Sequence, residues 1–341
     1  MPMGDESVLC LREAREQLER QFVGPYGVLA ADSKGRAAPE APDKVRTCFQ
    51  RDIDRITHSK AFRRLKHKTQ VFLRPEGDHY RTRLTHTLEV TRLARTAARA
   101  LRLNEDLTEA IGLGHDLGHT PFGHAGERAL RELMSGKFQH FEQSLRVVDR
   151  LEKDGRGLNL CYETRMGILN HTYGAADDTR EATLVRFSDR IAYLNHDLDD
   201  AERAGLLTEA DVPREIRDVC GNHTSERINR MITDLIVNSA RGEIGMSEPM
   251  AEVYDLFHNF MFDAVYRNPE AKGEESKVLG ILSGIFRWYA ANPDRLPPEF
   301  KAIAHADGLD RAVCDYIAGM TDGYALEVYE TIYIPAPWGR K

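Results

Sequence analysis

The sequence predicts an all-α protein. Apolar residues recur at positions i, i+3, i+4 and i+7 along nearly every segment of the 341 residues, which is the period of an amphipathic helix. Stretches in which apolar and polar residues alternate, as in a half-buried strand, are almost absent. We find no internal repeat, no low-complexity tract and no clear linker that would divide the chain. One helical domain with additions at its two ends is therefore the simplest interpretation.

The first predicted helix covers Ser7 to Phe22, where apolar residues recur with helical period among charged residues. Residues 24–47 follow as a connector that is rich in Gly, Pro, Ala and Asp and too polar to form a core. Helices resume near Phe49 and continue with short breaks.

The next helix of interest is expected to begin at Thr85. It places His86 on the same face as Val90, Leu93 and Ala97, which are apolar. His86 is therefore predicted to lie on the buried side of this helix.

Further helices are expected along the rest of the chain, because the same period continues. They cover residues 105–117, 123–134, 181–204, 223–240, 249–266, 274–291 and 310–329. On the helix of residues 181–204, Val185, Asp189 and Tyr193 fall along one side. The tail of residues 331–338 is predicted to pair as a short strand.

Composition restricts the class of protein. Hydrophobic residues make up 41% of the chain and charged residues 30%, as in globular proteins that bury a large core. No run reaches the apolar length of a membrane span and the first residues lack the features of a secretory signal, so we expect a cytoplasmic protein without a membrane partner. A net charge of −7 excludes a globally basic nucleic-acid binder.

Histidine is the residue type that stands out. Eight of the 13 histidines lie between His58 and His140. The segment HDLGHTPFGHAGE, residues 115–127, brings together three histidines and two carboxylates. An HD dipeptide alone occurs by chance in many proteins, but its conjunction with GHTPFGH and the preceding RTRLTH favours a functional site.

The residue types in this segment suit a metal ion. His115 and Asp116 project about 100° apart from a helix end, so one ion can bind both only if it lies over that end. His86 and Asp189, on the inner faces of other helices, are placed to add an imidazole and a second carboxylate. Mixed N and O ligation suits Mn²⁺, Fe²⁺, Co²⁺, Ni²⁺ or Zn²⁺ and tolerates Mg²⁺. Such a site is typical of metal-assisted hydrolysis, although a lone histidine such as His86 is more often a core residue.

Two other features of these helices indicate catalysis on a phosphate. His124 and Glu127 stand three residues apart at a helix start, where the carboxylate can orient the imidazole as a general acid or base. Arg83 precedes His86 by three residues and could clamp phosphate oxygens. The alternative for Arg81 and Arg83 is a pair of solvated surface charges.

Taken together, the motifs resemble the HD-domain deoxynucleoside triphosphate triphosphohydrolases, the dGTPase-like family. The resemblance spans nearly the whole chain and rests on the segments FQRDIDRITHSKAFRRLKHKTQVF, GDHYRTRLTHTLEV, HDLGHTPFGHAGE, GLNLCYETRMGI, LVRFSDRIAYLNHDLDDA and CDYIAGMTDGYA. It implies hydrolysis of a dNTP, such as dGTP, to deoxynucleoside and tripolyphosphate, and thereby control of the dNTP pool. It also implies an HD-domain helical fold with a metal-dependent phosphohydrolase core at residues 49–205, an N-terminal helix and connector at residues 1–48 and a C-terminal helical part at residues 206–341.

The resemblance also implies roles for single residues. The expected metal ligands are His86, His115, Asp116 and Asp189. The expected catalytic residues are His124, Glu127 and His119. The residues expected to bind substrate are Gln70, Arg83, His140, Arg190, Tyr193 and Asp197. Within the last set, Tyr193 would pack against the deoxyribose, while Gln70 and Asp197 would bind its 3′-hydroxyl. His119, His140 and Arg190 would contact phosphate, with a purely structural role as the alternative for His140.

Some features leave alternatives open. The basic residues Arg63, Arg64, Lys66, His67 and Lys68 could touch triphosphate or nucleic acid, although a solvated helix face is the favoured interpretation. Ile53 and Gly323 stand where the family pattern has arginines, which puts base selectivity or a subunit contact in doubt. By resemblance we expect a homo-oligomer, with a dNTP activator and single-stranded nucleic acid as further partners. Competing functions are an HD-type 5′-nucleotidase or phosphodiesterase, and a nucleotide-binding or single-strand-binding regulatory module with little turnover.

Overall fold

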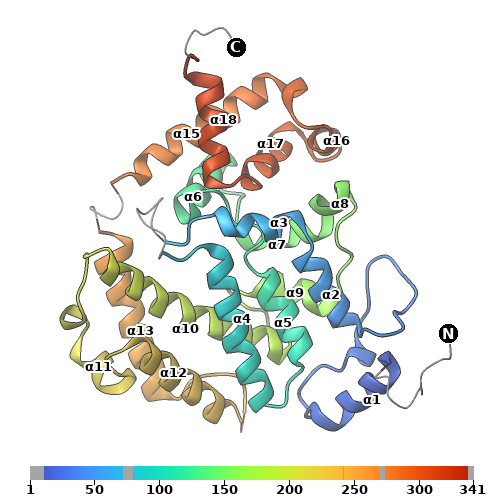
Figure 1. The fold of residues 1–341 in the computed structure, drawn as a ribbon, viewed down its shortest axis with the longest axis vertical. Helices are drawn as coiled ribbons and strands as arrows, with labels where there is room; N and C mark the ends of the chain where they lie inside the picture. Colours follow the sequence, from blue (N-terminus) through green and yellow to red (C-terminus); the bar gives the residue numbers. More distant parts are fainter. Residues whose placement is uncertain (1–10, 72–79, 241, 269–272, 337–341) are drawn as a thin grey trace, which may run out of the picture.

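The computed structural model describes residues 11–71, 80–240, 242–268 and 273–336, and these residues form helices and the segments that connect them, the longest of which covers residues 23–47 (Figure 1). Across these ranges no strand is formed. Two isolated β-bridges, of Arg36 with Cys161 and of Thr69 with Thr82, join extended segments. The prediction of an all-α fold is confirmed.

The helices have the following bounds. In chain order they are α1 (Arg12–Phe22), α2 (Cys48–Thr57), α3 (Lys60–Arg64), α4 (Arg83–Ala100), α5 (Glu105–Gly114), α6 (Gly123–Leu133), α7 (His140–Arg146), α8 (Glu152–Gly155), α9 (Tyr162–Asn170), α10 (Arg180–Arg203), α11 (Arg214–Cys220), α12 (Thr224–Ser239), α13 (Glu248–Met261), α15 (Glu275–Ala291), α16 (Pro298–Asp307), α17 (Leu309–Ala318) and α18 (Asp322–Tyr333). π-helical turns extend α7 over Val147–Leu151 and α13 over Phe262–Tyr266.

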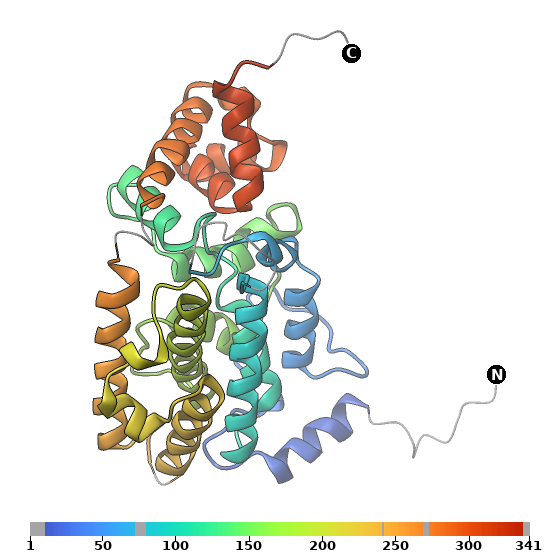
Figure 2. The same ribbon diagram turned by 60° about the vertical axis from the view of Figure 1, so that its left-hand side comes forward.

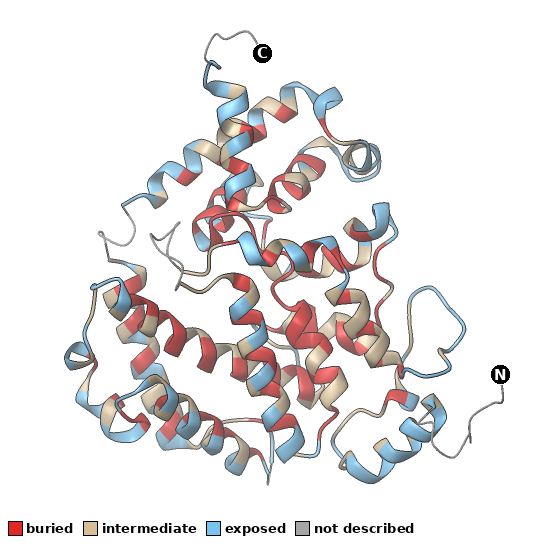
Figure 3. Cartoon of the chain, in the orientation of Figure 1, coloured by how far each residue is buried: buried red, intermediate tan, exposed pale blue. Residues whose placement is uncertain are grey.

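Helices α4, α5 and α10 form the centre of the molecule. α4 packs against α5 and α10, and α5 also packs against α2 and α9. Val90 and Ala94 of α4, Ile111 of α5 and Val185 of α10 belong to one fully buried apolar cluster. Figure 3 shows α5 buried along most of its length, as expected for a helix with neighbours on several sides.

Further apolar clusters extend this centre in two directions. Leu198 of α10 and Phe257 of α13 belong to a cluster shared with α11 and α12. Leu130 of α6, Leu282 of α15 and Ile317 of α17 belong to another, shared with α18. Figures 1 and 2 both show α15 to α18 gathered at one end of the molecule, next to α6. The C-terminal helices therefore connect to the centre chiefly through α6.

Helix α4 begins earlier than the sequence predicted. Its N-cap is Thr82, and a reciprocal pair of hydrogen bonds links Thr82 and Thr85: the hydroxyl of each accepts the backbone N–H of the other, at 3.5 and 3.0 Å. The predicted start at Thr85 is wrong by one turn, because this cap uses Thr85 as its third helical residue. Arg83 is consequently the first residue of the helix and lies one turn before His86.

The other predicted helices between residues 123 and 291 coincide with α6, α10, α12, α13 and α15 to within a few residues. α5 ends at Gly114, so His115 and Asp116 lie in the turn that follows it. The helix predicted from residue 7 begins at Arg12, and residues 7–10 lie outside the described part.

The C-terminal region differs from the prediction in two ways. The single helix predicted for residues 310–329 is broken into α17 and α18, because Thr321 caps a new helix by accepting the N–H of Tyr324 at 3.2 Å. The predicted tail strand is wrong for its first residues, since α18 runs to Tyr333 and residues 334–336 are not in a strand. Residues 337 and 338 of that prediction lie outside the described residues.

Within the described ranges, no helix combines the length and the apolar character that a membrane span requires.

Candidate active site

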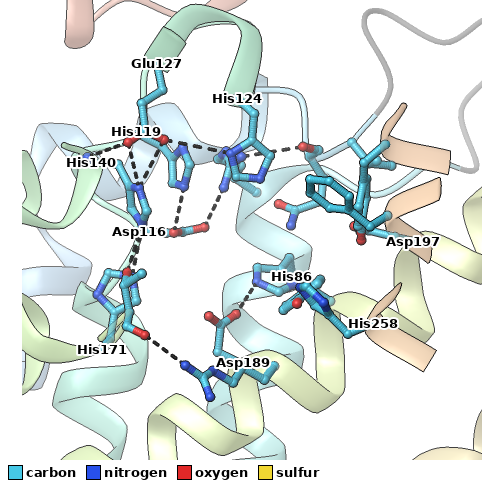
Figure 4. A pocket seen from close by; sticks show the side chains of 18 of the residues that line it. His86, Asp116, His119, His124, Glu127, His140, His171, Asp189, Asp197 and His258 are labelled. Atoms are coloured by element: carbon cyan, nitrogen blue, oxygen red, sulfur yellow. Dashed lines mark hydrogen bonds and ion pairs between the residues drawn. The ribbon is translucent and has the colours of Figure 1, made fainter. Parts of the chain in front are cut away.

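A cavity of about 690 Å³ opens between α4, α6, α10 and α13. Every residue assigned to a site from the sequence lines it, apart from His115. His115 lies directly after α5 and is only 1% exposed. Figure 4 shows the side chains converging on Asp116 from several helices. The fold thus brings together residues that are more than 100 positions apart in the chain.

Four of these residues offer a mixed set of nitrogen and oxygen donors. His86 Nε2 lies 3.0 Å from Asp189 Oδ1, and His115 Nε2 lies 3.8 Å from the same oxygen. His115 Nε2 also lies 3.6 Å from Asp116 Oδ1. Burial opposes the ionisation of Asp189, but the hydrogen bond with His86 lowers its pKa to about 2. The four predicted ligands therefore lie together, with an ionised carboxylate among them.

The tautomer of His115 prepares one nitrogen for a cation. Its Nδ1 lies 2.7 Å from the carbonyl oxygen of Gly112, which can only accept, so Nδ1 carries the proton. Nε2 is then an acceptor, and it is buried without a hydrogen-bond partner among the described residues. A buried acceptor without a donor fits a metal ligand whose orientation is held by its other ring nitrogen.

Arg83 is a buried residue of this cavity. Its side chain is 2% exposed, and Nη1 donates to Asp116 Oδ2 at 2.8 Å. The alternative of a solvated surface charge is therefore wrong for Arg83. Arg81 is half-buried and pairs outside the cavity with Asp199 at 2.8 Å and Asp200 at 3.0 Å.

Glu127 contacts two histidines. His124 Nδ1 lies 3.8 Å from Glu127 Oε2, while His140 Nδ1 lies closer, at 3.1 Å. Arg131 Nη2 donates to the other oxygen of Glu127 at 2.9 Å. Burial opposes ionisation, yet the hydrogen bonds with His124 and His140 hold the pKa of Glu127 far below its ordinary value. The predicted pairing of Glu127 with His124 is present, and the carboxylate also orients His140, which the spacing did not indicate.

His119 lies between the carboxylate of Asp116 and the ring of His140. Its ring stacks on His140 with centroids 4.3 Å apart, and its Nε2 lies 3.3 Å from Asp116 Oδ1. Burial and the nearby charge of Arg83 lower the pKa of His119 well below its ordinary value, so the ring is neutral at pH 7.

Gln70, Tyr193 and Asp197 also line the cavity. Asp197 Oδ2 accepts the hydroxyl of Tyr266 at 2.6 Å, and burial raises the pKa of Asp197 to about 6. Asp197 Oδ1 and Gln70 Oε1 are buried without a partner in the described part of the chain. Arg190 also lines the cavity, and donates to the carbonyl oxygen of Thr172 at 3.1 Å. Two acceptors are thus available to a hydroxyl group.

Comparison with known proteins places the chain in a family. The HD domain model matches residues 83–194, and the phosphohydrolase-associated domain model matches residues 244–331. A deoxyguanosinetriphosphate triphosphohydrolase-like protein of Caldanaerobacter subterraneus subsp. tengcongensis is 53% identical over 329 residues, which cover 96% of this chain and 97% of the relative. The chain belongs to the deoxyguanosinetriphosphate triphosphohydrolase-like family. A second member of this family, from Desulfatibacillum aliphaticivorans, is 49% identical over 349 residues, which cover 96% of this chain and 99% of that one.

A solved structure supports the fold alone. A phosphohydrolase of Bacteroides thetaiotaomicron is 17% identical and aligns over 83% of this chain and 68% of its own, with a TM-score of 0.50. The match to the HD domain model begins at Arg83 and includes all four candidate metal ligands.

The boundaries predicted for the N-terminal part, the core and the C-terminal part, at residues 48/49 and 205/206, stay a prediction.

Several residues of the cavity were missed from the sequence. His171 follows α9 and is 3% exposed, and burial lowers its pKa to about 3. It lies outside the histidine-rich stretch and in no motif, so only its place directly after a helix could have indicated it. Tyr254, His258 and Tyr266 line the cavity from α13 and the turn after it. Their spacing of four or eight residues marks one helix face, a signal that ordinary core residues also produce.

The basic segment before the cavity is only in part a solvated face. Arg63, Lys66 and His67 are exposed, as favoured from the sequence. Lys68 is buried instead: its Nζ donates to the carbonyl oxygens of His119 and Ala318, and burial lowers the pKa of Lys68 to about 7. The interpretation as surface charge is therefore wrong for Lys68.

Proposed function

We propose that this chain is a metal-dependent hydrolase that converts dNTPs, dGTP among them, to deoxynucleoside and tripolyphosphate. One observation carries the proposal: His86, Asp116 and Asp189 line one cavity together with the groups proposed for proton transfer and the acceptors proposed for a hydroxyl, and His115 Nε2 lies within 3.8 Å of an oxygen of each carboxylate. The names of the relatives support the substrate class. A cytoplasmic location, expected from the sequence, suits a reaction on the dNTP pool.

The donor set would hold one divalent cation. Two imidazoles and two carboxylates suit Mn²⁺, Fe²⁺, Co²⁺, Ni²⁺ or Zn²⁺, and Mg²⁺ is tolerated. The buried Nε2 of His115, which finds no hydrogen bond in the described residues, supports this assignment. When bound, the cation would supply positive charge that polarises a phosphoryl oxygen.

The residues around Asp116 would bind and orient the phosphates. Arg83 carries a guanidinium whose Nε is buried without a partner among the described residues, so it has a donor left for a phosphate oxygen. His119 and His140 stack beside it and add imidazole nitrogens, and Arg190 adds a second guanidinium at the cavity wall. These groups would hold the α-phosphate in place while charge develops on it.

His124 would transfer the proton. Its side chain is 63% exposed and lines the cavity, while Nδ1 faces Glu127. The ionised carboxylate of Glu127 would keep the proton on Nδ1 and present Nε2 to the water or to the leaving oxygen. Glu127 is therefore an orienting partner of the proton-transfer group.

Tyr193, Gln70 and Asp197 would recognise the deoxyribose. Gln70 Oε1 and Asp197 Oδ1 can each accept the 3′-hydroxyl, because neither has a donor in the described part of the structure. The ring of Tyr193 would pack against C2′, where a 2′-hydroxyl would clash. This arrangement would favour dNTPs over ribonucleotides.

The test is to incubate the protein with each of the four dNTPs, singly and mixed, with Mn²⁺ or Mg²⁺, and to follow products by phosphorus NMR. We expect tripolyphosphate from the wild type and none from Asp189→Ala, which loses a ligand. Asp199→Ala is the matched control, since Asp199 lies on the same helix but pairs with Arg81 outside the cavity. Orthophosphate alone would indicate a nucleotidase or phosphodiesterase, and binding without product would indicate a regulatory module.

The proposal extends, by resemblance, to assembly and regulation. We propose a homo-oligomer that is activated by a second dNTP and that also binds single-stranded nucleic acid. Tripolyphosphate that forms only in dNTP mixtures would support activation, and light scattering gives the subunit number. A rate of tripolyphosphate release that is the same with single dNTPs and with mixtures would contradict activation by a second dNTP. A monomeric mass would contradict the homo-oligomer.

A further inference from the structure

An exposed aromatic ring lines a cavity that is otherwise almost entirely polar. Among the described residues that line it, only Val71 and Phe262 have side chains without a polar atom. Phe262 opens the π-helical turn after α13 and is 40% exposed. We propose that Phe262 stacks on the base of the bound nucleotide. The inference rests on the proposed function, because it uses the positions given there to the phosphates and the deoxyribose.

The proposed positions of the phosphates and the sugar determine where the base lies. The base and the phosphates of a nucleotide leave the sugar at different carbons, C1′ and C5′. Figure 4 shows Asp197 on the side of the cavity away from His140, with Asp116 between them. With the α-phosphate beside Asp116 and the 3′-hydroxyl at Asp197, the base extends from the Asp197 side of the cavity, away from Asp116.

Phe262 lies on that side. Its ring centroid is 6.4 Å from that of Tyr266, and the hydroxyl of Tyr266 donates to Asp197 Oδ2 at 2.6 Å. The other oxygen of this carboxylate is the acceptor proposed for the 3′-hydroxyl. Val71 directly follows Gln70, the second proposed acceptor. Both apolar side chains of the cavity therefore adjoin a residue that is proposed to bind the sugar.

Neighbouring side chains hold the ring of Phe262 without covering it. The guanidinium of Arg267 lies over the ring, with its Cζ 4.5 Å from the ring centroid. The ring of His258 is nearly parallel to it, at 20°, with the centroids 6.2 Å apart. Parallel rings at this separation are offset and overlap only in part. The ring is thus oriented from two sides, and its exposed part is available to a flat ligand.

A second exposed aromatic residue of the cavity, Tyr173, lies on the phosphate side. Its ring is 5.4 Å from that of Phe141, which is 5.6 Å from that of His140, a proposed phosphate contact. A base on Tyr173 would draw the sugar away from Asp197. In the proposed orientation of the nucleotide, the base therefore meets Phe262 and not Tyr173.

Stacking on Phe262 has a consequence for the range of substrates. A base needs only a flat aromatic face to stack, and all four bases have one. Phe262 should therefore contribute to the binding of every dNTP, and more to purines, whose rings cover a larger area. It cannot select one base by hydrogen bonding, because its side chain has no donor or acceptor.

The experiment compares a nucleotide with and without its base. Full-length His124→Ala, with and without Phe262→Ala, is titrated by isothermal calorimetry with dGTP and with the abasic analogue 1,2-dideoxyribose 5′-triphosphate, in the presence of Mn²⁺. Phosphorus NMR verifies that the ligands stay intact. If they do not, 2′-deoxyguanosine and 1,2-dideoxyribose, which carry no phosphate, replace the pair.

We expect Phe262→Ala to raise the dissociation constant of dGTP by about 5-fold to 150-fold, the value of one base–aromatic stack. The dissociation constant of the abasic analogue should not change. Phe262→Trp, which keeps an aromatic face, should bind dGTP as the unsubstituted protein does. In the background that retains His124, Phe262→Ala should raise KM for dGTP with little change in kcat.

Two substitutions serve as matched controls. Leu256 is an exposed apolar residue of α13 that does not line the cavity, so Leu256→Ala should change the binding of neither ligand. Tyr173→Ala removes an exposed ring on the phosphate side and should affect both ligands equally. Melting curves verify that each variant is folded, and Phe262→Leu, which keeps apolar bulk without a ring, replaces Phe262→Ala if that variant is not.

An equal loss of affinity for dGTP and for the abasic analogue, or no loss for either, would overturn the role of Phe262. A loss confined to dGTP, in a protein that releases no tripolyphosphate, would preserve that role and remove the proposed hydrolysis. Tripolyphosphate release with equal losses would do the reverse. Absence of dGTP binding by the folded protein would remove both.

Discussion

Asp116 shows how much one side chain does at this site. Its carboxylate accepts from Arg83 at 2.8 Å, lies 3.3 Å from His119 Nε2 and lies 3.6 Å from His115 Nε2. Because it is buried, each of these partners acts without screening by solvent. A neighbouring carboxylate, Glu127, organises His124 and His140 in the same way. The two carboxylates therefore fix the tautomers and the directions of the surrounding imidazoles.

At this scale we predict that His124→Ala lowers kcat for tripolyphosphate release by about 100-fold to 10,000-fold, the usual contribution of a positioned acid or base. Metal content should stay at the wild-type value, because His124 is not among the proposed ligands. The measurement is steady-state turnover with metal analysis of the same sample. His305→Ala, an exposed histidine on α16, is the control. Turnover near the wild-type rate with metal bound would show that His124 does not transfer the proton.

At the scale of elements, the junction of α17 and α18 supports the loop that carries His119. Asp322, at the start of α18, accepts the backbone N–H of Phe122 at 2.8 Å and that of Thr69 at 3.0 Å, and also the hydroxyl of Thr69. Lys68 donates to a carbonyl on each side, at His119 and at Ala318. Phe122 has φ +63°, a left-handed conformation that such external bonds help to maintain. A residue of the phosphohydrolase-associated region thus braces a loop of the HD region.

We therefore expect Asp322→Ala to lower the free energy of unfolding by about 1–3 kcal/mol, because buried N–H groups lose their acceptor. Turnover should fall as well, since the loop before His124 loses its support. Urea unfolding and steady-state kinetics on the same preparation measure the two effects. Glu327→Ala, on the exposed face of the same helix, should change neither. Unchanged stability in Asp322→Ala would mean that the loop holds its conformation unaided.

At the scale of the whole molecule, Glu181 joins three parts of the chain. Its Oε1 accepts the N–H of Val28 in the connector and that of Asn104 at the start of α5, both at 2.9 Å, while Glu181 itself opens α10. Its Oε2 is buried without a partner among the described residues. Burial raises the pKa of Glu181 to about 7, even though these backbone hydrogen bonds lower it.

This pKa predicts a specific dependence of stability on pH. The folded protein holds the proton up to about pH 7, whereas the unfolded chain loses it near pH 4.5, so the folded state binds more protons between these values. The contribution of Glu181 to the free energy of unfolding is complete below pH 4.5, falls by about 1.4 kcal/mol per pH unit as pH rises to 7, and is constant above.

Glu181→Gln should remove this part of the pH dependence, which amounts to about 3 kcal/mol of unfolding free energy between pH 4.5 and pH 7. Urea unfolding from pH 5 to 8 measures it as the difference from the wild type. Glu215→Gln, at an exposed glutamate on α11, should keep the wild-type slope. A slope in Glu181→Gln equal to that of the wild type would contradict the raised pKa.

Much of this molecule could be predicted because the relevant signals are local. Helical period depends on residues three and four apart, so the all-α fold and most helices followed from the sequence. The assignment of His86, His115, Asp116 and Asp189 as metal ligands stays a prediction, although the fold brings their donor atoms together. Local rules failed where capping decided the boundary. The N-cap of α4 is Thr82, whereas Thr85 was expected. Thr321 caps a new helix, α18, within a segment whose apolar residues keep helical period throughout.

Tertiary structure alone decided which distant residues meet. His171 lies 31 positions from His140, yet the Nε2 atoms of the two residues are 3.3 Å apart. Asp322 lies 200 positions from Phe122, yet its carboxylate accepts the backbone N–H of Phe122. Lys68 is buried although its neighbours Lys66 and His67 are exposed. Spacing along a helix determines which face a side chain occupies, whereas the packing of helices determines what that face meets. The sequence by itself therefore determined the helices, the family resemblance and the chemical types in the site, and packing decided the partners that set their tautomers and charges.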